Sequence, residues 1–98
     1  MIILIDLKGC TTVLGFLDKV VKALKVMSFD GANLEVLGKT ISSLEKHGFF
    51  SPLRLELLNS KQYQEKCPTG WNIFIKSLKK AKEEYAKRDM EFEYSFTD

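Results

Sequence analysis

The spacing of apolar residues changes several times along the chain, and each change predicts a new element of secondary structure. Residues 1–7 form an almost unbroken run of β-branched and leucine side chains, which is typical of a strand buried on both faces. From residue 13 to residue 24 the apolar positions recur every three or four residues, with Thr11 or Thr12 placed to cap the start. The pattern therefore predicts a strand followed by a helix that ends near Val26.

A second helix and a second strand are predicted in the middle of the chain. Apolar residues from Leu34 to Leu44 step by three and four positions and indicate a helix that stops before Gly48. Residues 52–57 then alternate apolar and charged side chains behind a proline, which is typical of a strand with one covered face and one wetter face. We therefore expect residues 52–57 to form an edge strand.

The last third of the chain predicts two more helices and a final strand. Residues 59–66 have the pattern of a short polar helix, and the Cys-Pro-Thr-Gly segment at 67–70 is expected to break the chain after it. A long apolar stripe at helical spacing begins at Trp71 and reaches Tyr85. Residues 90–96 alternate apolar and polar side chains, which predicts a terminal strand.

Strands that alternate with helices predict a parallel sheet joined by right-handed crossovers. The apolar run at residues 1–7 marks the first strand as the central one, so the expected strand order is 2-1-3. With the first strand in the centre, the two crossovers run in opposite directions, and right-handedness then places helices on both faces of the sheet. The sequence thus predicts one α/β domain over residues 1–98, with a small three-stranded parallel sheet between helices.

Composition sets limits on the class of protein. The 98-residue chain is 45% hydrophobic and 29% charged, which suits one domain with a modest core. Its net charge of +2 is too small to indicate a nucleic-acid partner. The apolar start meets Asp6 at once and is far too short to span a bilayer, so we expect neither a membrane segment nor a targeting signal. Cys10 and Cys67 are expected to be reduced thiols in a cytoplasmic protein.

The sequence offers little support for enzyme chemistry. His47 is the only histidine, and it lies near a predicted helix end where an imidazolium favours the helix dipole. Cys10 and Cys67 lack the spacing of metal ligands, and no glycine-rich phosphate loop is present. Serines are available, but no histidine base with an orienting partner accompanies them. We therefore expect no catalytic residue, no metal and no cofactor.

The segment that joins the two predicted helices, residues 29–35, combines features of a turn, a helix cap and a binding loop. Gly31 can adopt the positive φ angles of a sharp reversal, Asn33 can cap the following helix, and Glu35 lies in the first turn of that helix. Phe29 and Asp30 precede the turn, and loop aromatics on rigid scaffolds often serve recognition. The same pattern also fits an ordinary capped helix with Phe29 in the core.

The order of predicted elements resembles the barstar family of small intracellular ribonuclease inhibitors, and the likeness covers nearly the whole chain. The most specific match is the aromatic-glycine-asparagine-leucine-acid pattern, Phe29-x-Gly31-x-Asn33-Leu34-Glu35-x-Leu37. Weaker matches are the segments Pro52-Leu53-Arg54-Leu55-Glu56, Ser60-Lys61-Gln62 and Ala81-Lys82. In that family, the loop and second helix plug a nuclease active site, while acidic side chains there and on the last helix oppose a basic cleft.

The resemblance and its departures define a candidate partner-binding face. The loop matches the family pattern, Glu35 matches its first acid, and Glu84 matches the last acid on the final helix. The residues of this face are Phe29, Asp30, Gly31, Asn33, Leu34, Glu35, Gly38, Lys39, Ser42, Lys80 and Glu84.

Three positions depart from the family pattern. Lys39 replaces the principal aspartate, Lys80 replaces the other acid of the last helix, and Gly38 replaces a tryptophan. Four acids in the family pattern sum to −4, whereas Glu35, Lys39, Lys80 and Glu84 sum to zero. Like charges at an interface repel, so the altered face is expected to disfavour a basic cleft of the barnase type.

We therefore expect a barstar-like protein-binding module, namely an intracellular inhibitor of the antitoxin or immunity type. Its expected partner is a ribonuclease or another nuclease toxin with a less basic cleft, and the free protein is expected to be a monomer. The alternative is a nucleic-acid-binding domain whose affinity falls steeply with salt. The lysines that would serve this alternative are Lys39, Lys76, Lys79 and Lys80.

Overall fold

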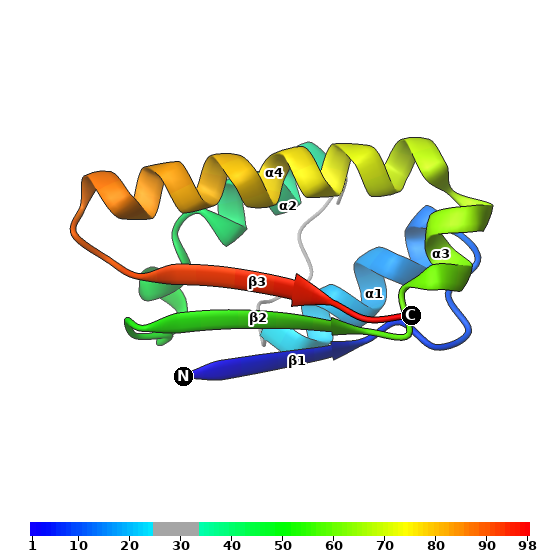
Figure 1. The fold of residues 1–98 in the computed structure, drawn as a ribbon, viewed down its shortest axis with the longest axis horizontal. Coiled ribbons are helices and arrows are strands. Elements are labelled where there is room, and N and C mark those ends of the chain that lie inside the picture. The colour runs from blue at the N-terminus through cyan, green and yellow to red at the C-terminus, as the bar shows by residue number, and fades with distance from the viewer. Residues whose placement is uncertain (25–33) are drawn as a thin grey trace.

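The computed structural model describes residues 1–24 and 34–98 of the chain, which form a three-stranded sheet covered by helices (Figure 1). The types of the predicted elements are confirmed, in the predicted order. Their bounds are β1 (Ile2–Asp6), α1 (Val13–Leu24), α2 (Leu34–Ile41), a 3-10 turn η1 (Leu44–His47), β2 (Leu53–Leu58), α3 (Lys61–Lys66), α4 (Pro68–Lys87) and β3 (Phe92–Phe96).

The strands form one parallel sheet in the order β1-β2-β3, so the predicted order 2-1-3 is wrong. The unbroken apolar run of β1 suggested burial on both faces, but only its alternate residues Ile3 and Ile5 are buried. Ile2 and Leu4 are 62% and 56% exposed on the opposite face. An apolar strand at the edge of a sheet with one open face gives the same sequence pattern as a central strand buried on both faces.

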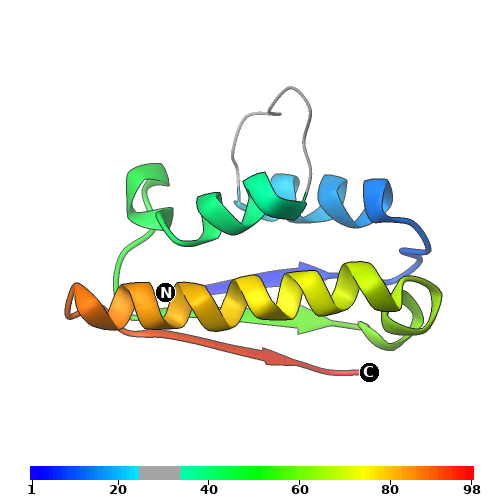
Figure 2. The ribbon, with the colours of Figure 1, turned by 90° about the horizontal axis from the view of Figure 1, so that it is seen from above.

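The helices lie on one face of the sheet, so the prediction of helices on both faces is also wrong (Figures 1 and 2). With the order β1-β2-β3, both crossovers run in the same direction, and right-handedness then places both sets of helices on the same side. The opposite face stays open, and on β2 it carries an ion pair between Arg54 and Glu56 with an N···O distance of 3.0 Å. The charged positions of β2 therefore mark the open face and not an edge position.

The second helix is shorter than the sequence predicts. α2 ends at Ile41, and the chain continues through the 3-10 turn η1 to Gly48, whose positive φ of 88° gives the expected left-handed end. Ser42 and Ser43 donate their hydroxyls to carbonyl oxygens four residues earlier, at 3.2 and 3.1 Å. Such bonds compete with regular helix geometry, which accounts for the break.

Local chemistry fixes the starts of α1 and α4. The Thr12 hydroxyl accepts a hydrogen bond from the Gly15 N–H at 3.0 Å, which identifies Thr12 rather than Thr11 as the cap. Pro68 is the first residue of α4, so the predicted break through residues 67–70 is too long. Proline suits this position because the first helical N–H has no partner within the helix.

The core lies between the sheet and the helices and is rich in aromatic contacts. The Phe16 ring of α1 stacks on Tyr63 of α3 with 4.5 Å between centroids, and meets Phe74 of α4 edge-on at 4.8 Å. These three side chains are at most 1% exposed. They join three helices above the sheet and so hold α4 in position for the site described next.

Candidate functional site

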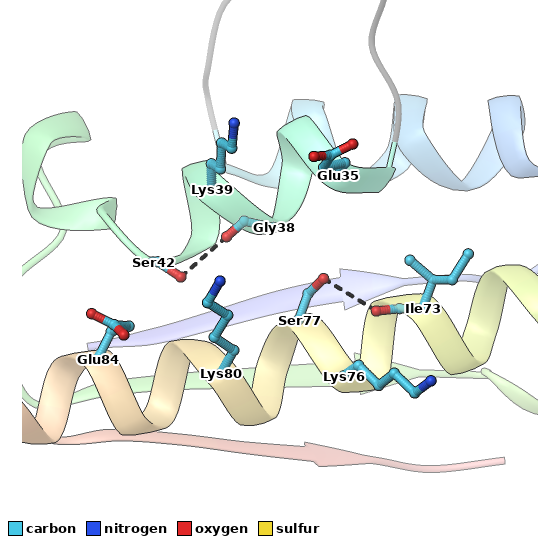
Figure 3. A pocket seen from close by; sticks show the side chains of 9 residues that line it. All are labelled: Glu35, Gly38, Lys39, Ser42, Ile73, Lys76, Ser77, Lys80 and Glu84. Carbon is cyan, nitrogen blue, oxygen red and sulfur yellow. Dashed lines mark hydrogen bonds between the residues drawn. The ribbon is translucent and has the colours of Figure 1, made fainter.

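A groove of about 610 Å³ lies between α2 and α4 (Figure 3). Its lining positions recur three or four residues apart on each side, which places them on the facing sides of the two segments. The α2 side contributes Glu35, Gly38, Lys39 and Ser42, and α4 contributes Ile73, Lys76, Ser77, Lys80 and Glu84.

The two sides of the groove come close together at Gly38 of α2 and Ser77 of α4. A Cβ atom added to Gly38 would lie 2.8 Å from the Ser77 hydroxyl oxygen and 3.2 Å from the Ser77 Cβ. Glycine therefore allows the two helices to approach closely at this point. The tryptophan of the family pattern would not fit here with α2 in its present position.

The C-terminal end of α2 is held against the last turns of α4 by buried hydrogen bonds. The Tyr85 hydroxyl donates to the Ile41 carbonyl at 2.6 Å and accepts from the Leu44 N–H at 2.8 Å. These are backbone groups that a helix end and a helix start leave without partners. Arg88 adds a hydrogen bond of 2.7 Å to the Ser42 carbonyl, so one end of the groove is fixed by α4.

Arg88 also contacts an aromatic ring and a carboxylate near this end of the groove. Its guanidinium lies 4.7 Å from the centroid of the Tyr85 ring and 3.3 Å from a carboxylate oxygen of Glu45. Burial is the main reason that the pKa of Tyr85 rises to about 12, so the phenol stays protonated and able to donate at neutral pH.

The charges that line the groove are unevenly compensated. Within residues 1–24 and 34–98, no carboxylate lies within 4.0 Å of the ammonium groups of Lys39, Lys76 or Lys80. Glu84, in contrast, forms an ion pair with Lys87 at 3.5 Å, outside the groove. The groove therefore holds more uncompensated positive charge than the sequence comparison of four positions indicates.

The three lysines point in different directions (Figure 3). Lys80 extends from α4 toward α2, into the space between Ser42 and Ser77. The Lys39 side chain extends from α2 away from α4, and the Lys76 side chain lies along α4 and points away from Lys80. Lys80 is thus the ammonium group directed into the groove, and the other two stand at its rim.

Six residues of the predicted face line this one groove: Glu35, Gly38, Lys39, Ser42, Lys80 and Glu84. Leu34 is half-buried and packs against the hydrophobic core, which gives it a structural role at the start of α2. Phe29, Asp30, Gly31 and Asn33 lie outside the described residues.

Sequence reasoning missed two groove residues, Ile73 and Ser77. Ile73 is 42% exposed and adds an apolar surface, and Ser77 forms the floor opposite Gly38. Ile73 lies seven residues before Lys80 on the same helix, and Ser77 lies three residues before it. Helical spacing from Lys80 could therefore have identified both residues.

Other candidate chemistry gains no support from the described residues. No group of three or more histidine, cysteine or acidic side chains among them could hold a metal ion. His47 is exposed in η1, and both cysteines are free thiols, with Cys10 buried. Burial raises the pKa of the Cys10 thiol, which opposes thiolate reactivity. No helix in the described part of the chain is long and apolar enough to cross a bilayer.

The fold and its groove define a class of small α/β domains in which three parallel strands are covered on one face by helices. Residues 1–97 match the family model of Barstar, the barnase inhibitor. The chain therefore belongs to the barstar family, whose members bind a ribonuclease as a protein partner, and the predicted resemblance is confirmed. No curated protein matches the chain in sequence.

We expect Gly38→Ala to lower the free energy of unfolding by roughly 1–2 kcal/mol, although alanine favours a helix by about 1 kcal/mol. The cause is the contact of the new methyl group with Ser77. Ser77→Ala removes the 2.8 Å contact with oxygen and should recover about half of the loss in the double variant. Chemical denaturation of the unmodified chain, the two single variants and the double variant measures the interaction energy between positions 38 and 77. A Gly38→Ala protein that is more stable than the unmodified chain would contradict the close approach of the helices.

Proposed function

We propose that this barstar-family domain is a non-enzymatic inhibitor of a nuclease, of the antitoxin or immunity type, and that it acts inside the cell as a monomer. The observation that carries the proposal is the convergence of six candidate residues on the α2–α4 groove, in a chain that matches the family over residues 1–97. We further propose that the loop residues Phe29, Asp30, Gly31 and Asn33 extend the same binding face.

The charge of the face favours a nuclease other than one with a strongly basic cleft. Lys39 and Lys80 would meet the phosphate-binding cations of such a cleft, and like charges placed together at an interface cost several kcal/mol. A factor of ten in affinity is only about 1.4 kcal/mol. The proposed partner therefore has a less basic or an acidic surface at the point of contact.

The proposal predicts that the immobilised chain retains a nuclease from native cytosol and that the purified chain inhibits this enzyme. Glu35→Ala should weaken inhibition about tenfold, because the exposed Glu35 carboxylate lines the groove and can accept hydrogen bonds from donors of the partner. Glu65→Ala is the matched control, since Glu65 is an exposed acid on α3 and does not line the groove. Titration of nuclease activity measures both. Equal inhibition by all three proteins would place the binding face elsewhere.

The alternative of a nucleic-acid-binding domain is favoured by one observation, namely the lysines at the groove without nearby carboxylates. Two others weigh against it. Lys79 does not line the groove, and the carboxylates of Glu35 and Glu84 do. A phosphate chain that follows the groove would approach both acids, so protein binding is the better-supported function.

A further inference from the structure

We propose that the α2–α4 groove receives a carboxylate-bearing side chain that projects from the partner protein, and that Lys80 forms the main contact with it. This inference rests on the proposed function and specifies the chemistry of the partner. In this arrangement the domain supplies the recess and the partner supplies the projection.

The shape of the site is the first argument. Glycine at position 38 leaves no side chain to project from the centre of α2, and the backbone there lies close to Ser77. The space of about 610 Å³ beside this contact is open toward solvent between two helices. A partner can fill it only with a projecting group of its own, because a flat surface would leave the recess empty.

The second argument is which polar groups remain available to a ligand. The Ser77 hydroxyl donates to the Ile73 carbonyl at 3.1 Å, and the Ser42 hydroxyl donates to the Gly38 carbonyl at 3.2 Å. Both hydroxyl protons are therefore engaged within the protein. Among the described residues that line the groove, the strong donor directed into it is the ammonium group of Lys80, which requires an acceptor from the partner.

The third argument is charge. Lys39, Lys76 and Lys80 contribute three positive charges at the groove, while the Glu84 carboxylate is paired with Lys87. Among the described residues, Glu35 is the one acid of the lining without a cation within 4.0 Å. The three lysines outnumber this single free carboxylate, so the groove favours a negatively charged group from the partner. A carboxylate on a stem of methylene groups also fits the apolar surface of Ile73, which is 42% exposed.

The probe for this inference is a capped hexapeptide of alternating glutamate and leucine, titrated into the isotope-labelled full chain and followed by backbone amide NMR. We expect the amides of Gly38, Ser77 and Lys80 to shift together. Lys80→Gln should weaken the binding about three- to tenfold. Lys79→Gln is the matched control, because it removes the same charge from the neighbouring position of α4 and does not line the groove.

Four results would overturn the inference. They are no shift with the acidic peptide, tighter binding of the same peptide with lysine in place of glutamate, tighter binding of oligo-uridylate at the same amides, and equal loss in the two lysine variants. None of them depends on finding a nuclease. Conversely, capture of a nuclease that is sensitive to Glu35→Ala would keep the proposed function even if the acidic peptide failed.

Discussion

Tyr85→Phe is expected to lower the free energy of unfolding by roughly 2–4 kcal/mol, although it removes a single oxygen atom. The Tyr85 hydroxyl bonds to two backbone groups, the Ile41 carbonyl and the Leu44 N–H, and all three residues are buried with no measurable exposure. Without the hydroxyl, both backbone groups are left in the core without partners, and each such group costs about 1–3 kcal/mol.

The packing of the Tyr85 ring should survive this substitution. The ring stacks on Phe92 with 5.0 Å between centroids and lies beneath the Arg88 guanidinium, and phenylalanine can keep both contacts. The expected loss therefore reports the hydrogen bonds and not a cavity. Since natural domains of this size have total stabilities of about 5–15 kcal/mol, the change should be obvious in urea denaturation.

Tyr63→Phe is the matched control. Tyr63 is as deeply buried as Tyr85, but its hydroxyl has no hydrogen-bond partner among the described residues. Its removal should change the stability by less than about 1 kcal/mol, or raise it, because an unsatisfied polar group leaves the core. Equal losses in the two variants would show that the loss comes from removing a buried oxygen atom, and not from the hydrogen bonds of Tyr85.

The two phenylalanine variants should also differ from the unmodified chain in how their stability depends on alkaline pH. Burial raises the pKa of both Tyr63 and Tyr85 from 10 in the unfolded chain to about 12 in the fold. Ionisation of either phenol is therefore less favourable in the fold than in the unfolded chain, so these groups leave the free energy of unfolding constant below pH 10 and lower it as the pH rises to about 12. Each phenylalanine variant should lose less stability across this interval than the unmodified chain does.

The sequence was enough to predict the types of the elements and their order along the chain. It was not enough to predict the order of the strands in the sheet or which face the helices cover. Helical and alternating periods identified the elements because each period reflects which side of one segment is covered. Strand order depends on which strands meet, and Ile2 and Leu4 were misleading because they are apolar and exposed. The alternation at Arg54 and Glu56 correctly indicated a wet face, although it was assigned to an edge strand.

The candidate site shows the same division between local and tertiary information. The family pattern assigned Glu35 and Lys39 on one helix, and Lys80 and Glu84 on the other, to a single face, and the spacing of four residues within each pair agrees with this assignment. The direction of a side chain depends on neighbours from other elements. Only the structure distinguishes Lys80, which extends into the groove, from Lys39, which extends away from it.

Gain of inhibition is the second large effect that we expect, from Lys39→Asp combined with Lys80→Glu. The unmodified chain should inhibit a barnase-type ribonuclease weakly, and the double variant should inhibit it at least about a hundredfold better. Two repulsive contacts become attractive, and each needs to supply only about 1.4 kcal/mol for this gain. A ribonuclease assay titrated with each protein measures the inhibition constants.

Net charge alone must be separated from the charge of the face. The double variant changes the net charge from +2 to −2, because each lysine replaced by an acid changes it by −2. Lys66→Asp with Lys79→Glu makes the same change at exposed positions that do not line the groove. Inhibition by this control variant would indicate general attraction to a basic enzyme, which salt screens over about 10 Å at 0.1 M.

We expect the double variant to inhibit less strongly than a protein with the full family pattern, because Gly38 cannot be replaced by the family's tryptophan without a clash. A tryptophan at this position would meet Ser77, whose hydroxyl oxygen already lies 2.8 Å from the place of a Cβ atom. Gly38→Trp added to the double variant should therefore displace α2 and reduce inhibition, although it completes the family pattern. If it improved inhibition instead, α2 could move relative to α4 without cost, and the close contact at Gly38 would not be what shapes the groove.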